Sequence, residues 1–243
     1  MSKSKNTRKN NSRIFILALI LLVPGFLYIA LNRFGANEYV SLPVFGDKVL
    51  SGKINRKMGR EFPDTIFHTI DTIGLSNYKG EHITFLDDDT AMSVVHLFYT
   101  QDQSFSRLML NSFEKLSNRF QHTPTVRFYS ISVDASDSAE VLTDFIKPYS
   151  GLENLKWQIA SKPDTLSFKY FTDNLLIDAM IDPLDSTKFI VGNQIVLIDS
   201  KRRIRGYYDI GLKGEMDRLE DEIRLQLIEE IRNNKIHKVE KQL

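Results

Sequence analysis

The segment from Ser93 to Phe120 constrains the fold more than any other part of the chain. Its first residues, Val94–Tyr99, are β-branched, aliphatic and aromatic, which predicts a buried strand. A polar run, Thr100–Ser104, follows. From Phe105 the apolar residues recur at helical spacing, which predicts a helix to Phe120 with one buried face. A buried strand, a short turn and an amphipathic helix therefore follow one another directly.

Thioredoxin-like folds hold a pair of redox cysteines at such a turn, where the start of the helix lowers the pKa of a thiol. This chain contains no cysteine. Because a thiolate is the nucleophile in thiol–disulfide exchange, the composition excludes thiol oxidoreductase and thiol peroxidase activity. The absence of cysteine also excludes a fold that is held together by disulfide bonds.

An apolar run near the amino terminus, Ile14–Leu31, is long enough to cross a bilayer. Basic residues precede it, namely Lys3, Lys5, Arg8, Lys9 and Arg13. This charge distribution predicts a cytoplasmic amino terminus and an exported remainder. A cleaved signal peptide is the alternative, which Pro24-Gly25 keeps open, although the run is long for one and no cleavage site stands out after it. We expect a single-pass anchor in the inner membrane, with the lipid bilayer as its partner and the rest in the periplasm.

The remaining sequence predicts one α/β domain. After a strand-like start at Phe62, the pattern predicts a strand at 94–99, a helix at 105–120 and a strand at 126–133. A helix from Ser136 or Asp137 to Tyr149, a short strand from Trp157 and a helix to about Asn174 are predicted next. The last predicted elements are a polar loop at 182–188, a hairpin of 195–198 with 204–208, and a helix at 215–235. This order predicts a mixed central sheet flanked by helices. The expected organisation is a basic cytoplasmic segment (1–13), a transmembrane anchor (14–31), a juxtamembrane linker (32–59), the domain (60–235) and a charged tail (236–243).

Two motifs in this domain are similar to those of a known family. The strand end Phe98-Tyr99-Thr100-Gln101 resembles the Phe-x-Thr that precedes Cys-Pro-x-x-x-Cys-Pro in that family. The run Ile195–Asp199, continued by Ser200–Asp209, resembles its apolar strand, turn and Gly-Arg-Ile-Arg-Gly-x-Tyr-Asp sequence. The chain thus resembles the Sco/SenC family, which are membrane-anchored, thioredoxin-like copper proteins of cytochrome oxidase assembly. The resemblance implies a thioredoxin-like fold over most of the chain after the first forty residues.

The resemblance also implies where copper would bind. The two cysteine positions of the family fall on Asp102 and Ser106, and its histidine position falls on Val191. All three copper ligands are therefore substituted, and a carboxylate is a hard ligand, poorly suited to Cu(I). The resemblance is to a degenerate member with a pseudo-active site.

Two donors near these positions carry an alternative hypothesis. His96 lies in the predicted strand and Met109 in the predicted helix, and both residue types bind copper. A rebuilt, cysteine-free metal site would use His96, Met109 or Asp102. We expect His96 to be a core histidine instead, so no cofactor is predicted and copper is the alternative.

The expected function is non-catalytic binding of a protein partner. The net charge of +1 predicts no broad nucleic-acid surface. Gln101 and Gln103 flank the substituted site, and Arg203 and Arg205 lie in a basic hairpin, so these four residues form the expected partner surface. The resemblance implies a role in respiratory oxidase biogenesis or envelope homeostasis, with a respiratory-complex subunit as the partner. Copper delivery is the alternative function.

Overall fold

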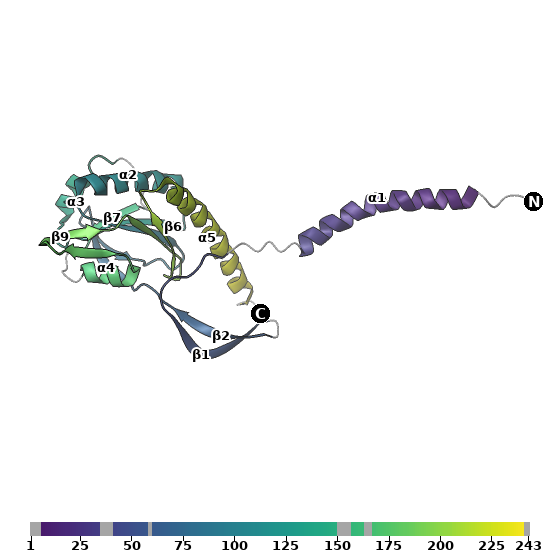
Figure 1. The fold of residues 1–243 in the computed structure, drawn as a ribbon, viewed down its shortest axis with the longest axis horizontal. Helices are drawn as coiled ribbons and strands as arrows, with labels where there is room; N and C mark the ends of the chain where they lie inside the picture. Colours follow the sequence, from purple (N-terminus) through teal and green to yellow (C-terminus); the bar gives the residue numbers. More distant parts are fainter. Residues whose placement is uncertain (1–5, 35–40, 58–59, 150–156, 163–166, 241–243) are drawn as a thin grey trace, which may run out of the picture. The chain divides into compact units, whose positions relative to one another are not determined.

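The computed structural model describes residues 6–34, 41–57, 60–149, 157–162 and 167–240 (Figure 1). The chain divides into two compact units, Met1–Val40 and Ser41–Leu243. The first contains helix α1 (Asn6–Phe34), which includes the whole apolar run 14–31. Among the described residues, no helix combines the length and the hydropathy needed to cross a bilayer. The transmembrane anchor stays a prediction.

A seven-stranded mixed sheet forms the centre of the second unit. Its strand order is β11-β10-β5-β6-β7-β3-β4. The pairs β5–β6 and β6–β7 are parallel and the other neighbours are antiparallel. The strands are β3 (Ile73–Asn77), β4 (His82–Phe85), β5 (Met92–Phe98), β6 (Val126–Ser132), β7 (Trp157–Ser161), β10 (Gln194–Ile198) and β11 (Ile204–Asp209). Every residue of β5 is buried, in agreement with its apolar sequence.

Helices cover both faces of this sheet (Figure 1). They are α2 (Gln103–Arg119), α3 (Ala139–Ile146), α4 (Ser167–Leu175) and α5 (Lys213–Glu240). On one face α2, α3 and α5 pack against a cluster that includes Phe98, Phe113 and Phe128. On the other face α4 packs against a cluster that includes Tyr129 and Phe171. The predicted mixed sheet flanked by helices is confirmed.

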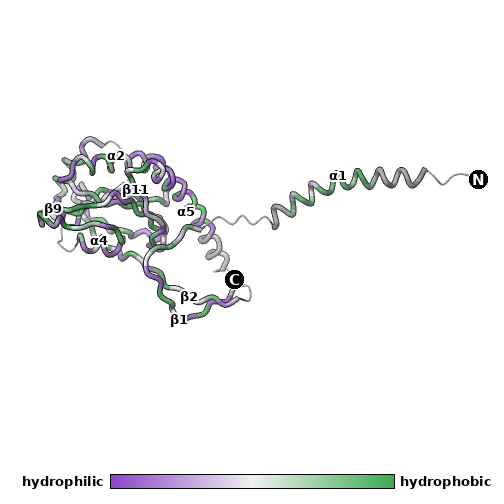
Figure 2. The backbone as a smooth tube through the Cα atoms, in the orientation of Figure 1, coloured by the Kyte–Doolittle hydropathy of each residue, from purple (hydrophilic) through white to green (hydrophobic). Residues whose placement is uncertain are grey.

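Two antiparallel hairpins lie outside the central sheet. One is β1 (Lys48–Lys57) with β2 (Arg60–Phe67), and the other is β8 (Ala179–Asp182) with β9 (Asp185–Val191). Part of the expected linker 32–59 is therefore a strand, and the expected polar loop 182–188 lies largely in a hairpin. Hydrophobic and hydrophilic residues are mixed along β1 and β2 (Figure 2), and each hairpin contains a register shift. Such a pattern lacks the strict alternation by which a strand is predicted.

Two helix boundaries also differ from the prediction. Helix α3 begins after Ser138, whose hydroxyl accepts a hydrogen bond from the Val141 amide, and ends at Ile146 rather than Tyr149. Helix α5 continues to Glu240 and so includes the first part of the expected tail. Residues 1–5 and 241–243 of the expected terminal segments lie outside the described residues.

Candidate functional site

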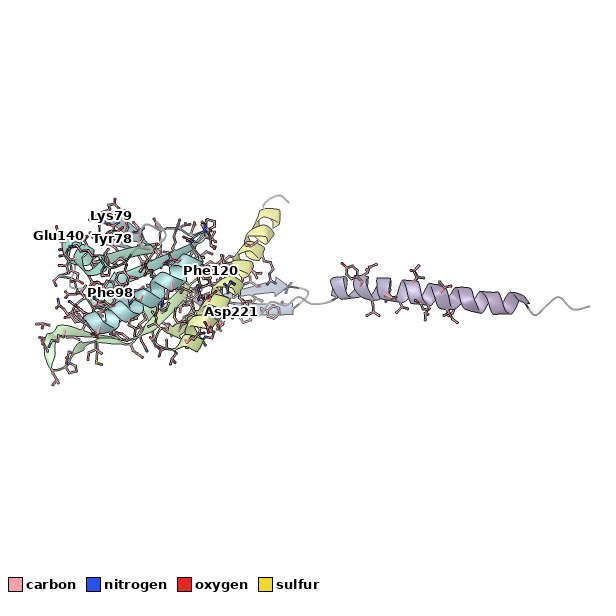
Figure 3. The ribbon with its side chains drawn as sticks, turned by 90° about the horizontal axis from the view of Figure 1, so that it is seen from above. Tyr78, Lys79, Phe98, Phe120, Glu140 and Asp221 are labelled. Atoms are coloured by element: carbon pink, nitrogen blue, oxygen red, sulfur yellow. The ribbon has the colours of Figure 1, made fainter. Side chains whose placement is uncertain are left out.

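A small cavity of about 140 Å³ lies where β5 ends and α2 begins, with β9 on its other side. Asp102, Ser106 and Val191 all line it, and Met109 lies on its wall. The structure therefore brings together the three positions at which the resemblance predicted substituted ligands, although Asp102 and Val191 are 89 residues apart in sequence. Phe98, labelled in Figure 3, also lines the cavity and is buried.

Asp102 is the N-cap of α2. Its carboxylate accepts a hydrogen bond of 3.3 Å from the Phe105 amide, and its carbonyl accepts one of 3.0 Å from the Ser106 amide. An aspartate here satisfies an amide that has no partner within the helix and places a negative charge at the positive end of the helix dipole. The first cysteine position of the resemblance is thus occupied by a capping residue.

Ser106 connects the first turn of α2 to the end of β5. Its hydroxyl donates to the Tyr99 carbonyl at 2.7 Å and accepts from the Tyr99 amide at 3.2 Å. The side chain is fully buried. Because both hydrogen bonds go to the backbone of one residue, Ser106 acts as a clamp between helix and strand and offers little donor capacity to the cavity.

Val191 ends β9, and the hairpin that carries it contacts the end of β5 through an aromatic residue. The Tyr99 hydroxyl donates to the Thr187 carbonyl at 3.3 Å, and the Tyr99 ring meets the Phe189 ring edge to face at a centroid separation of 5.4 Å. Burial raises the pKa of the Tyr99 hydroxyl, which therefore stays a neutral donor. Valine has no lone pair for a metal, so this wall of the cavity is apolar.

His96 does not line the cavity. It is completely buried in β5, and its Nε2 lies 2.7 Å from the Ser130 hydroxyl, which accepts a hydrogen bond from the Trp157 indole at 2.9 Å. The Phe113 ring packs against the imidazole at a centroid separation of 4.4 Å. Burial lowers the pKa of His96 to about 4. The expectation of a core histidine agrees with this placement.

Met109 is buried in the wall of the cavity. Its thioether is the one soft donor among the cavity-lining side chains. Asp102 is engaged as a cap, the hydroxyl of Ser106 is used by the backbone, and Val191 has no donor atom. The residues at the cavity therefore do not fit the cysteine and histidine set that holds copper in the family that the chain resembles. Within the part of the chain that the structure describes, no cluster of three His, Cys, Asp or Glu side chains could hold a metal ion.

A buried carboxylate close to this site had no clear sequence signal. Asp137 accepts hydrogen bonds from the hydroxyls of Thr100 at 3.0 Å and Ser132 at 2.5 Å, and its carbonyl accepts one from Ser161 at 2.7 Å. Burial raises its pKa, against the effect of the two hydroxyl donors. The sequence predicted Asp137 only as a candidate first residue of a helix, because its burial depends on strands β5, β6 and β7 meeting around it.

The expected partner surface is only partly exposed. Gln101 and Gln103 are exposed beside the cavity. Arg203 is largely buried and makes a two-point contact with Asp199. The prediction of Arg205 on this surface is wrong, because its side chain is 1% exposed and pairs with Asp199 and Glu229.

The β8–β9 hairpin presents apolar side chains to solvent beside the cavity. Leu184, at its turn, is 96% exposed, and Met180, Ile181 and Ile190 are also exposed. Phe189 and Val191, from the same hairpin, face the domain and line the cavity. Ile181 is opposite Phe189 and shares the side that faces the domain, whereas Met180 and Ile190 are paired on the other side.

No protein-family model and no curated protein sequence matches the chain. Solved structures do match. A SCO1/SenC family lipoprotein from Bacillus anthracis has a TM-score of 0.57 and 20% identity, over 66% of this chain and 95% of its own. BsSco, described as a member of the Sco family of cytochrome c oxidase assembly proteins, has a TM-score of 0.55 and 13% identity, over 65% of this chain and 92% of its own.

A third structure, copper-bound ScoI from Arabidopsis thaliana, has a TM-score of 0.51 and 14% identity, over 68% of this chain and 99% of its own. The chain therefore has the thioredoxin-like fold of the Sco/SenC structures, as the resemblance implied. It has this fold without a single cysteine.

Proposed function

We propose that this protein is a degenerate, membrane-anchored member of the Sco group that binds a protein partner beside its substituted metal site, without a resident metal. One observation carries the proposal. The three ligand positions converge on one cavity, but a helix cap, a backbone-bonded hydroxyl and an apolar side chain occupy them. A site that keeps the cavity but has no metal-donor atoms still has a surface of defined shape, and such a surface is suited to binding a protein.

The exposed side of the β8–β9 hairpin is the binding surface in this proposal. Met180 and Ile190 are paired on this side, and Leu184 is exposed at the turn between the two strands. Clustered apolar side chains of this kind are typical of protein-binding surfaces. Gln101 and Gln103, which are exposed on either side of Asp102 in the sequence, supply polar groups to this surface in the proposal. Because the similar structures include assembly proteins of cytochrome c oxidase, the proposed partner is a respiratory-complex subunit.

The proposal includes an anchor formed by residues 14–31. The apolar run and the five basic residues before it support this anchor, with the amino terminus in the cytoplasm and the domain in the periplasm. Resistance to carbonate extraction from membranes, together with protease accessibility of the domain in spheroplasts, tests the anchor and its orientation.

A copper titration tests the absence of a resident metal. Cu(I) and Cu(II) are titrated separately, in competition with a chelator, into the wild-type protein and into the triple variant Asp102→Cys, Ser106→Cys, Val191→His. The triple variant is expected to bind copper, since its three ligands surround one cavity, and the wild type is expected not to compete. Stoichiometric, tight binding by the wild type would instead support copper delivery through a rebuilt site that contains Met109.

A matched pair of substitutions tests the binding surface. Ile190→Asp places a charge on the exposed side of the β8–β9 hairpin, and Ile231→Asp makes the same change at an exposed position of α5. In crosslinking of intact membranes, the adduct between this protein and a respiratory-complex subunit should be lost with the first variant and kept with the second. Equal loss, or equal retention, would contradict the assignment of the surface.

A further inference from the structure

The β1–β2 hairpin stands apart from the central sheet and its helices within the second unit (Figure 1). Its two strands pair only with each other among the described strands. Asp64 accepts hydrogen bonds across the hairpin from Ser51 and Asn55, and Arg56 pairs with Glu61, so the polar side chains hold the two strands together. A two-stranded ribbon is marginally stable in water, so this hairpin is expected to have a partner surface.

Both faces of the hairpin carry exposed apolar side chains. Val49 is opposite Ile66 on one face, and these side chains are 61% and 59% exposed. Leu50 and Ile54 lie opposite Thr65 and Pro63, on the other face, and they are 67% and 65% exposed. The flat surface of one protein would cover one face only. A medium that surrounds the ribbon and is apolar on both sides satisfies both faces at once.

The hairpin is also the cationic part of an acidic domain. Residues 48–67 contain five Lys or Arg and two Asp or Glu, whereas residues 68–243 contain 21 Lys or Arg and 27 Asp or Glu. Three of the five, Lys48, Lys53 and Arg56, are exposed on β1. A negatively charged surface would therefore attract the hairpin and repel the rest of the domain.

We propose that the β1–β2 hairpin docks into the headgroup region of an anionic phospholipid bilayer. Its apolar side chains would enter the boundary between headgroups and acyl chains, while Lys48 and Lys53 would contact lipid phosphates. This inference rests on the proposed anchor, since the hairpin begins at Lys48, a short distance along the chain after α1 ends at Phe34. The anchor keeps the hairpin near the bilayer, and the hairpin orients the domain on it.

The absence of cysteine allows a direct test on the full chain. Ile54→Cys and Leu184→Cys, each labelled with the environment-sensitive fluorophore NBD, place the probe on the two hairpins that expose apolar side chains. Both proteins are reconstituted into vesicles of phosphatidylcholine with or without phosphatidylglycerol. The Ile54 probe should gain intensity and shift to the blue only with phosphatidylglycerol, and 0.5 M salt should reduce the effect. The Leu184 probe should stay aqueous in every vesicle.

Removing positive charges from the hairpin tests how much each of them contributes to docking. In the Ile54→Cys background, replacing Lys48 and Lys53 by Gln should weaken docking by about fivefold for each residue, because each cation near an anionic surface contributes independently. Vesicle flotation in the same samples reports the anchor separately. Absence of flotation would overturn the anchor, whereas flotation with an aqueous Ile54 probe would overturn hairpin docking alone. A probe signal that follows protein density and ignores phosphatidylglycerol would identify a second copy as the partner and would also overturn the proposal.

Discussion

Protonation of His96 is expected to destabilise the fold, and the effect can be isolated by one substitution. The imidazole is buried between β5 and α2, with Ser130 as its close polar partner and the Phe113 ring against it. No acidic side chain contacts the ring among the described interactions, so nothing compensates a positive charge there. Burial lowers its pKa from 6.5 to about 4.

The sign and size of the effect follow from linkage. Well above pH 6.5 the histidine is neutral in both the folded and the unfolded chain and contributes no pH dependence. As the pH falls from 6.5 toward 4, the unfolded chain takes up the proton and the folded chain does not, so the free energy of unfolding decreases. At pH 4 the loss amounts to about 3 kcal/mol for this pair of pKa values.

The assay compares urea unfolding of the wild type with that of His96→Gln between pH 7 and pH 4. The fluorescence of Trp157, the only tryptophan, reports unfolding, because the indole is buried and hydrogen-bonded to Ser130. Glutamine retains an oxygen that can accept from Ser130 and does not titrate, so carboxylate effects are common to both proteins. The difference between the two free energies of unfolding should change by about 3 kcal/mol over this range. Parallel pH profiles would refute the buried, uncompensated state of His96 and reopen its role as a metal ligand.

Three other substitutions test the contacts around the site by urea unfolding. Ser106→Ala should cost about 1–3 kcal/mol, because it removes both hydrogen bonds to the Tyr99 backbone, and a cost near zero would contradict the clamp. Arg205→Met should cost about 3–5 kcal/mol, because Glu229 loses its buried partner, and a small cost would show that water replaces the pair. For Asp137→Asn, the stability of the wild type relative to the variant should rise as the pH falls, since burial raises the carboxyl pKa in the folded state; an unchanged difference would mean that the carboxyl keeps its ordinary pKa.

Elements with a clear periodic pattern were predictable from sequence alone. Helix α2 was predicted at 105–120 and lies at Gln103–Arg119, since its apolar residues repeat at helical spacing and form one buried face. The hairpin β10–β11 was predicted at 195–198 and 204–208 and lies within one residue of these bounds. In both cases the residues that the local pattern predicts to be buried are the ones that pack into the core of the folded domain.

The hairpins outside the central sheet were less predictable, although the strand-like start expected at Phe62 lies in β2. β1 and β2 have apolar residues on both faces, and a register shift separates Leu50 from Ile54. The alternation that marks a strand depends on one buried face, which this hairpin lacks. Residues 182–188, which hold the turn and the first part of β9, were predicted as a polar loop because they include Asp182, Asp185 and Lys188. The contacts that position β9, such as that between Tyr99 and Phe189, join residues 90 positions apart.

The convergence of Asp102, Ser106 and Val191 on one cavity came from the resemblance and not from any local pattern. The roles of these residues did not follow from it. That Ser106 would close onto the Tyr99 backbone depends on the distance between the first turn of α2 and the end of β5, which only the folded chain defines. The same holds for Asp137, whose burial requires three strands to meet.

Arg205 shows why a motif shared with a family is weak evidence for a shared surface. Its guanidinium donates to the Leu42 carbonyl at 2.6 Å and to the Pro43 carbonyl at 3.2 Å, and it pairs with Asp199 and Glu229. It therefore connects β11, the turn before it, α5 and the start of the second unit. The stability of the fold accounts for this arginine in full, so its presence says nothing about a partner. The exposed apolar side chains of β8–β9 and β1–β2 are different, because no contact within the domain requires them. The proposals on binding therefore rest on those two hairpins, where an apolar side chain in water has a cost that only another surface can offset.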